Sequence, residues 1–303
     1  MNRRFRTCLF ICLWAAILFI TISLDADIIL TKYFSLQYEA KDEKNAQNIA
    51  ERFDKIIWSV NREIGFYNIS GIKVLLCSSN DEFTDLMTLS GKLPDQTVAF
   101  AVPKFKTITL KNPKDMPAKS DYYKILKHEY CHILLHHIAP QSRIPLWFDE
   151  GFAQYFAKQW NFTKEVEFLM DALQGNTLNL SKYNYHYPKY KNKVGMFYLQ
   201  SYYNFKKLIA DYDFVKFQKF LEMLNQTEKF SISFYRIYGC TVQQFLEKVQ
   251  NSIKPHLILA LFYSGFGFIW TLIPFLLLIA FIRKQIKKRR VEKRWSEEED
   301  WKL

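Results

Sequence analysis

Two short stretches of the chain hold residue types at spacings that could do chemistry. The first runs from His128 to His132 and reads H-E-x-x-H. On a helix, residues four apart lie on the same face, so two imidazoles at this spacing can bind one zinc ion. Glu129 lies beside the water that such an ion would activate. A catalytic zinc takes three protein ligands, so the third has to come from elsewhere in the chain.

The candidate for this third ligand is Glu150, in the stretch W-F-D-E-G-F-A from Trp147 to Ala153. A tryptophan, two residues and then Glu-Gly-x-Ala resembles the glutamate helix of the gluzincin metallopeptidases, found in aminopeptidase-N-like enzymes and in the peptidase MA-like domain. The resemblance implies that Glu150 is the third zinc ligand. Here 17 residues separate His132 from Glu150, one fewer than in the aminopeptidases. The adjacent Asp149 points about 100° away from Glu150 on a helix, so both cannot face one metal.

Helices must position these residues. Ser120 and Asp121 offer a helix start. The residues that then recur at helical spacing are Tyr122, Ile125, His128, Glu129, His132 and Leu135. The alternative is an amphipathic helix whose histidines face solvent. Cys131 turns away from the metal on such a helix, and we interpret it as a core residue.

The flanking pattern predicts an α+β fold. Its expected elements are a helix over 41–65, a strand over 72–76, a helix opening at Ser79, and strands over 98–102 and 107–110. Residues 145–255 read as mostly helical. This order resembles the peptidase MA-like domain, which implies an N-terminal α/β subdomain with a small mixed sheet, a mainly α-helical C-terminal subdomain and a zinc site between them.

Two further roles follow from the resemblance. In gluzincins the strand before the zinc helix is an edge strand that binds substrate backbone, and residues 98–102 are its counterpart here, unless they form an ordinary sheet strand. Peptidase MA-like domains often carry Tyr-x-x-Ser where relatives keep a catalytic tyrosine, and Tyr198 matches it. A hydroxyl there could stabilise an oxyanion. The alternative is a core tyrosine, and Tyr202 and Tyr203 lie nearby.

The two ends of the chain suggest a membrane protein. Residues 1–6 carry three arginines and precede a charge-free run over 7–24, which predicts a transmembrane anchor. A signal peptide is the rival interpretation, although the sequence after residue 23 fits a cleavage site poorly. A second charge-free run over 257–282 predicts a transmembrane helix, followed by a basic tail over 283–303. Positive flanks mark the cytoplasmic side, so both termini are expected in the cytoplasm and a domain over 25–255 outside it.

The distribution of charge indicates which partners to expect, and the cysteine count bears on disulfides. Of the net charge of +12, the N-terminal tail holds +3 and the C-terminal tail +4, which leaves +5 for the remainder. The basic pI therefore comes partly from charges that set membrane topology and not from a nucleic-acid surface, and no nucleic-acid partner is expected. The basic tail could also contact membrane lipid. Cys77, Cys131 and Cys240 are an odd number outside the spans, so no disulfide framework is indicated.

Together these features predict a membrane-anchored zinc metallopeptidase that cleaves a peptide or protein substrate outside the cytoplasm. His128, His132 and Glu150 would hold Zn²⁺, and Glu129 would act as the general base. The alternative is a non-catalytic, membrane-anchored binding or sensor protein that keeps the fold. The presence of Glu129 distinguishes the enzyme from the binding protein, because a protein without catalysis could lose this residue at no structural cost.

Overall fold

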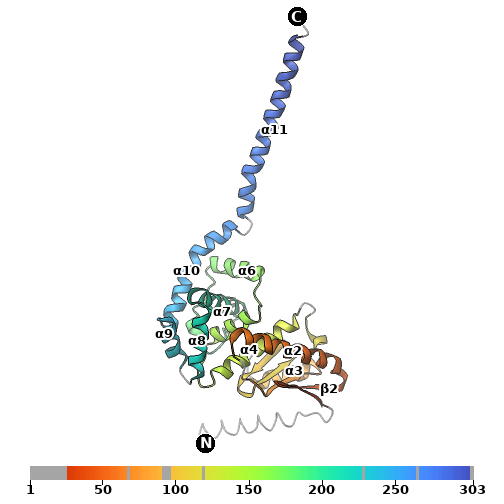
Figure 1. Cartoon of the computed structure of the whole chain (residues 1–303), viewed down its shortest axis with the longest axis vertical. Coiled ribbons are helices and arrows are strands. Elements are labelled where there is room, and N and C mark those ends of the chain that lie inside the picture. The colour runs from red at the N-terminus through yellow and green to blue at the C-terminus, as the bar shows by residue number, and fades with distance from the viewer. Residues whose placement is uncertain are drawn as a thin grey trace. The chain divides into compact units, whose positions relative to one another are not determined.

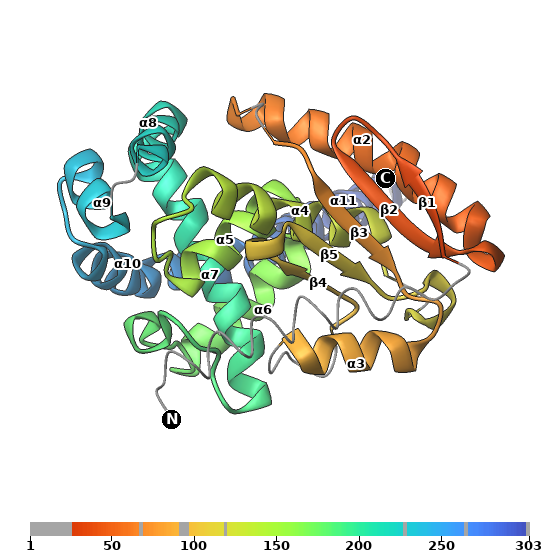
Figure 2. The ribbon, with the colours of Figure 1, turned by 90° about the horizontal axis from the view of Figure 1, so that it is seen from below.

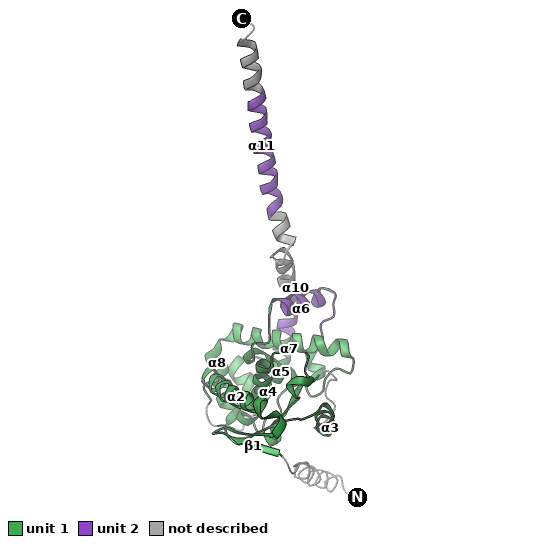
Figure 3. Ribbon diagram, turned by 90° about the vertical axis from the view of Figure 1, so that its right-hand side faces the viewer, with its two compact units in different colours: residues 1–161, 178–246 green, residues 162–177, 247–303 purple. Residues whose placement is uncertain are grey.

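The computed structural model describes residues 26–66, 69–90, 97–117, 120–226, 229–263 and 266–300. The chain forms two compact units (Figure 3). The first contains residues 1–161 and 178–246, and the second contains residues 162–177 and 247–303. The sheet and all five predicted site residues belong to the first unit.

A five-stranded mixed sheet forms one half of the first unit (Figures 1 and 2). Its strands are β1 (Ala26–Leu30), β2 (Phe34–Glu39), β3 (Ile72–Leu76), β4 (Ala99–Val102) and β5 (Thr107–Leu110), in the spatial order β1-β2-β3-β5-β4. The pairs β2–β3 and β3–β5 are parallel, whereas β1–β2 and β4–β5 are antiparallel. The predicted α+β class and the small mixed sheet are confirmed.

Helices cover both faces of this sheet. They are α2 (Glu43–Ile64), α3 (Asn80–Ser90) and α4 (Tyr122–Ile138). Phe34 of β2 packs on Phe53 of α2, with ring centroids 4.8 Å apart. Phe100 of β4 packs on Phe83 of α3 at 5.5 Å. The strand register places Phe34 and Phe100 on opposite faces, because side chains alternate along each strand. Phe53 also contacts Tyr130 of α4, so α2 and α4 share one face.

Strand β4 lies at an edge of the sheet, as expected for residues 98–102. The amide of Lys111 donates to the carbonyl of Val98 at 3.0 Å. Bonded pairs alternate along an antiparallel ladder, so the backbone groups of Ala99 and Ala101 point away from β5. Helix α4 packs beside this strand. The open edge of β4 therefore borders the helix that carries His128 and His132.

The remainder is helical, as predicted. Its helices are α5 (Leu146–Phe156), α6 (Phe162–Leu173), α7 (Lys191–Tyr212), α8 (Phe214–Asn225), α9 (Phe230–Tyr238), α10 (Val242–Tyr263) and α11 (Phe266–Asp300), with a short 3-10 turn η4 at Leu180–Tyr183. Phe148 of α5 anchors the aromatic core by contacting Phe205, Phe220 and Phe230. Gly239 ends α9 with a φ of 72°, and α10 begins three residues later.

The β1–β2 hairpin was not predicted, although Phe34, Leu36 and Tyr38 alternate with polar residues as a half-buried strand requires.

The predicted first span, 7–24, lies outside the described residues. The predicted second span, 257–282, falls across α10 and α11, with residues 264 and 265 outside the described part. Among the described residues, no helix is long and apolar enough to cross a membrane.

Candidate metal centre

Helix α4 presents the two histidines on one face. Its N-cap is Asp121, as predicted, whose carboxylate accepts from the Lys124 amide at 3.2 Å. Tyr130, on the buried side, donates from its hydroxyl to Asn61 of α2 at 2.5 Å, which fixes α4 against the sheet layer. The rings of His128 and His132 lie one turn apart, with centroids 4.7 Å apart. The helix therefore sets the spacing of the two imidazoles before any metal binds.

Helix α5 brings Glu150 to the histidines because its other face is packed tightly. Trp147 is fully buried and stacks on Phe245, with ring centroids 6.0 Å apart. Gly151 faces α7 so closely that a Cβ atom built there would lie 2.5 Å from the Ser201 carbonyl oxygen. The tryptophan and glycine of the motif are thus explained by packing, and Glu150 is the residue they position.

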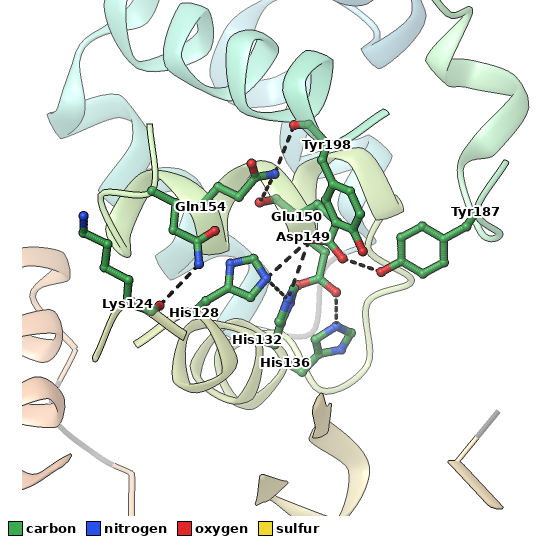
Figure 4. Close-up of polar contacts among 10 residues, drawn as sticks. Lys124, His128, His132, His136, Asp149, Glu150, Gln154, Tyr187 and Tyr198 are labelled. Carbon is green, nitrogen blue, oxygen red and sulfur yellow. Dashed lines mark hydrogen bonds and ion pairs between the residues drawn. The ribbon is translucent and has the colours of Figure 1, made fainter. Parts of the chain in front are cut away.

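Three candidate ligand atoms converge at this place (Figure 4). The Nε2 atoms of His128 and His132 are 3.1 Å apart, and Oε2 of Glu150 lies 3.5 Å and 3.9 Å from them. A tetrahedral zinc about 2.0–2.1 Å from each ligand sets its ligand atoms roughly 3.3 Å apart. The triangle therefore has the size that zinc needs, with little adjustment.

The polar groups at this site also fit a metal. Oε2 of Glu150 is buried and accepts no hydrogen bond from any described residue. The other oxygen, Oε1, accepts a hydrogen bond from the hydroxyl of Tyr187. A buried carboxylate oxygen without a donor is costly unless a cation satisfies it. The orphaned oxygen faces the two imidazoles, as a third ligand would.

Asp149, next to Glu150, lies behind His132. Its Oδ1 atom is 2.6 Å from Nδ1 of His132, and its Oδ2 atom is 2.9 Å from Nε2 of His136. Burial acts to lower the pKa of His132, but the charge of Asp149 and their hydrogen bond outweigh it and raise this pKa to about 10. Burial acts to raise the pKa of Asp149, and His132 and His136 lower it overall. Asp149 thus supports the site without facing the metal position, as its angle predicted.

Glu129 is buried beside the same cluster. Burial is the main cause that raises the pKa of its carboxyl above the ordinary range, while the charges of His128 and His132 act in the opposite direction. The backbone N–H of Ala101, on the open edge of β4, donates to the carboxylate. Glu129 therefore joins the histidine pair to the edge strand.

Tyr198 of α7 is also at the site. Burial and then the charge of Glu150 raise the pKa of its hydroxyl, which makes a side-chain hydrogen bond with Tyr187. Gln154 bridges the two helices, because its amide donates to the carbonyls of Glu150 and Tyr198 at 3.2 Å and 3.0 Å. Tyr202, by contrast, stacks on Trp160 with centroids 4.2 Å apart. The Tyr198 hydroxyl is thus linked to Glu150 through Tyr187, whose own hydroxyl donates to that carboxylate.

A family model of the Peptidase MA superfamily matches residues 61–255, more than half of the 303-residue chain. The chain belongs to the Peptidase MA superfamily. No curated protein sequence matches it. Membership places the chain among peptidase-type hydrolases with a metallopeptidase-like fold, and the His-His-Glu group could hold a metal.

The matched region of this Peptidase MA member contains every predicted site residue and three supporting residues that sequence reasoning missed. Asp149 was judged only by its angle to Glu150, and its contact with His132 was not foreseen. His136 lies one turn beyond His132, outside the H-E-x-x-H motif, and its contact with Asp149 was not predicted either. Tyr187 lies in the tyrosine-rich segment between η4 and α7, where no motif singles out one ring.

Proposed function

We propose that the chain is a zinc-dependent metallopeptidase that hydrolyses peptide bonds outside the cytoplasm and is anchored in the membrane. The observation that carries the proposal is the convergence of His128, His132 and Glu150, with a buried Glu129 carboxylate beside them. This donor set matches the three protein ligands of catalytic zinc. Membership of the Peptidase MA superfamily supports the same reaction class.

The residues divide the chemistry among them. His128, His132 and Glu150 would hold zinc, which when bound polarises the scissile carbonyl and acidifies a water molecule. Glu129 takes a proton from the attacking water and gives it to the leaving amine. A pKa raised by burial suits this double task, because the best acid–base catalyst has a pKa near the working pH. The Tyr198 hydroxyl stabilises the oxyanion.

The open edge of β4 supports a mode of substrate binding. Ala99 and Ala101 direct their backbone groups away from β5, and the Ala101 amide already reaches Glu129. A substrate backbone added along this edge would lie beside the catalytic carboxylate. Such β-strand addition obtains its affinity from main-chain hydrogen bonds, and side-chain pockets then set specificity. We therefore propose a peptide or protein substrate bound as an extended strand.

Membrane anchoring is supported by the sequence and by exposure in the second unit. Large apolar side chains from Leu272 to Ile282 of α11 are between 38% and 66% exposed. An exposed apolar surface of this length marks a contact with a membrane or a protein. The basic residues that follow, beginning with Arg283, match the cytoplasmic flank of a span and would meet anionic lipid. The first predicted anchor, 7–24, rests on its sequence alone.

The decisive experiment compares the full-length wild-type chain with its Glu129→Gln variant, each purified in detergent and loaded with zinc. Both are incubated with a mixed peptide library, and the products are identified by mass spectrometry. Wild type should cleave, and the variant should be slower by about 10²–10⁴-fold, the usual effect of losing a general base. Glu51→Gln is the matched control, because Glu51 is an exposed glutamate of α2.

Equal product profiles from wild type and Glu129→Gln would contradict the proposed role of Glu129 and point to a contaminating protease. No cleavage by zinc-loaded wild type across the library would favour the alternative, a non-catalytic binding or sensor protein. The presence of Glu129 beside the candidate ligands favours the enzyme, because peptide hydrolysis needs a general base at that place.

A further inference from the structure

Tyr187 contacts the site from a segment that carries none of the predicted residues. It lies between η4 and α7, and Figure 4 shows its ring approaching Glu150 from the side opposite Gln154. Its hydroxyl donates to Oε1 of Glu150 and is hydrogen-bonded to Tyr198. Tyr187 is therefore the link between a candidate metal ligand and the candidate oxyanion donor.

Packing and backbone contacts hold Tyr187 in its position. Its ring packs edge-on against the buried Phe197 of α7, with centroids 5.8 Å apart. Pro188 follows it and restricts the backbone. Just before it, the carbonyl of Asn184 accepts from the amide of Leu146 at 2.7 Å, which ties the segment to the start of α5. Both helices that carry Glu150 and Tyr198 thus hold this segment in place.

The number of available hydrogens decides which hydroxyl donates and which accepts in the contacts of Tyr187. A tyrosine has one O–H to donate, and an ionised carboxylate can only accept. Tyr187 therefore gives its single hydrogen to Glu150. With that hydrogen already used, Tyr187 can only accept from Tyr198, which makes Tyr198 the donor between the two hydroxyls. The chain of bonds runs from Tyr198 through Tyr187 to Glu150.

We propose that Tyr187 is a positioning residue for this site, an inference that rests on the proposed function. By occupying Oε1 of Glu150 it leaves Oε2 as the single oxygen directed at His128 and His132. By accepting from Tyr198 it fixes the orientation of that hydroxyl before substrate arrives. Outer hydrogen-bond partners of metal ligands commonly act in this way, and their loss typically costs about 10–100-fold in metal affinity.

The first test measures zinc affinity and needs no catalysis. Full-length wild type, Tyr187→Phe and Tyr190→Phe are purified in detergent, stripped of metal and titrated with zinc against a chromogenic chelator. Tyr187→Phe keeps the ring and its contact with Phe197 but removes the donor to Glu150. It should bind zinc about 10–100-fold more weakly. Tyr190, in the same segment and 68% exposed, provides the control and should leave the affinity unchanged.

A wild-type zinc affinity in Tyr187→Phe would overturn the inference while leaving the proposed function intact. If wild type itself bound no zinc, the inference and the proposed metal site would both fail. The thermal midpoint of metal-free Tyr187→Phe should fall below those of wild type and Tyr190→Phe, because the buried Glu150 loses a hydrogen-bond donor. A midpoint that fell in Tyr187→Phe with no loss of zinc affinity would identify a purely structural residue and also overturn the inference.

A second test separates the role of Tyr187 toward Tyr198 from its role toward Glu150. The rate constant kcat is measured at saturating zinc for wild type, Tyr187→Phe, Tyr198→Phe and the double variant. If Tyr187 acts on the reaction by orienting Tyr198, removing it should lower kcat in the wild-type background and have no further effect once Tyr198 is gone. Additive losses in the double variant would overturn the orienting role toward Tyr198. Tyr198→Phe alone should keep the wild-type zinc affinity.

Discussion

Among the described residues, Asp149 and His132 make the shortest contact between a carboxylate and an imidazole at this site, with Oδ1 and Nδ1 2.6 Å apart. The contact lies on the side of the ring away from Nε2, which is 3.1 Å from Nε2 of His128. A carboxylate in this place fixes the tautomer and orientation of a metal-binding histidine. Asp149 also binds His136, so one carboxylate is shared by two histidines one turn apart on α4.

Replacing Asp149 with Asn should weaken zinc binding. The amide has the same shape but lacks the charge that aligns His132, so the affinity should fall by about 10–100-fold. Competition with a chelator measures the change. Asp85→Asn, at an exposed position of α3, should bind zinc like wild type. Equal affinities for Asp149→Asn and wild type would show that α4 packing alone orients His132.

The contact between Asp149 and His132 predicts that the stability of the metal-free chain depends on pH. The folded pKa of His132 is raised to about 10, above the ordinary value of 6.5, so the folded state holds this proton more tightly than the unfolded state. The stabilisation is therefore complete below pH 6.5 and is lost as the pH rises through about 10. Thermal midpoints of metal-free wild type and Asp149→Asn should differ most at the acidic end of this range and converge toward pH 10. A difference in thermal midpoint that stayed constant over this pH range would contradict the raised pKa of His132.

The ligand set predicts one zinc per chain. Substituting Ala for His128, His132 or Glu150 should remove it, because each leaves only two protein donors. Elemental analysis of the purified full-length variants measures the content. His137→Ala is the matched control on the same helix and should retain zinc. Full zinc content in Glu150→Ala would contradict the assignment of Glu150 as the third ligand.

Gly151→Ala should destabilise the protein. The new methyl group would lie 2.5 Å from the Ser201 carbonyl and 2.7 Å from Cβ of Phe205, so α5 and α7 would have to separate. Overpacking of this kind costs about 1–3 kcal/mol, which exceeds the gain of about 1 kcal/mol in helix propensity. Gly195→Ala in α7 meets open space and should be neutral or stabilising. Urea unfolding compares the two, and a stabilised Gly151→Ala protein would refute the close approach.

Membrane topology can be read with reporter fusions. A reporter joined after His256, before the second charge-free run, should be exported, and one joined after Leu303 should stay in the cytoplasm. The reverse pattern would overturn the proposed location of the site. Sequencing the mature N-terminus addresses the first run, because a chain that begins near Asp27 would have lost a signal peptide and kept one span.

The sequence by itself determined the parts of the site that follow from helical periodicity and from one family pattern. His128, Glu129 and His132 are bound to share a region of space, because residues one and four apart on a helix are neighbours whatever surrounds them. Glu150 was predicted through its resemblance to a known motif, and the packing of Trp147 and Gly151 explains why that motif exists.

Only the tertiary structure decided which groups meet these residues from other elements. Tyr187 and Glu150 are 37 residues apart in the chain, and the Ala101 amide reaches Glu129 from a different layer. No local rule specifies such contacts, since they depend on how a loop crosses two packed helices and on which edge of the sheet stays open. Periodicity fixes neighbours within an element, whereas neighbours between elements are fixed by the packing of the whole core.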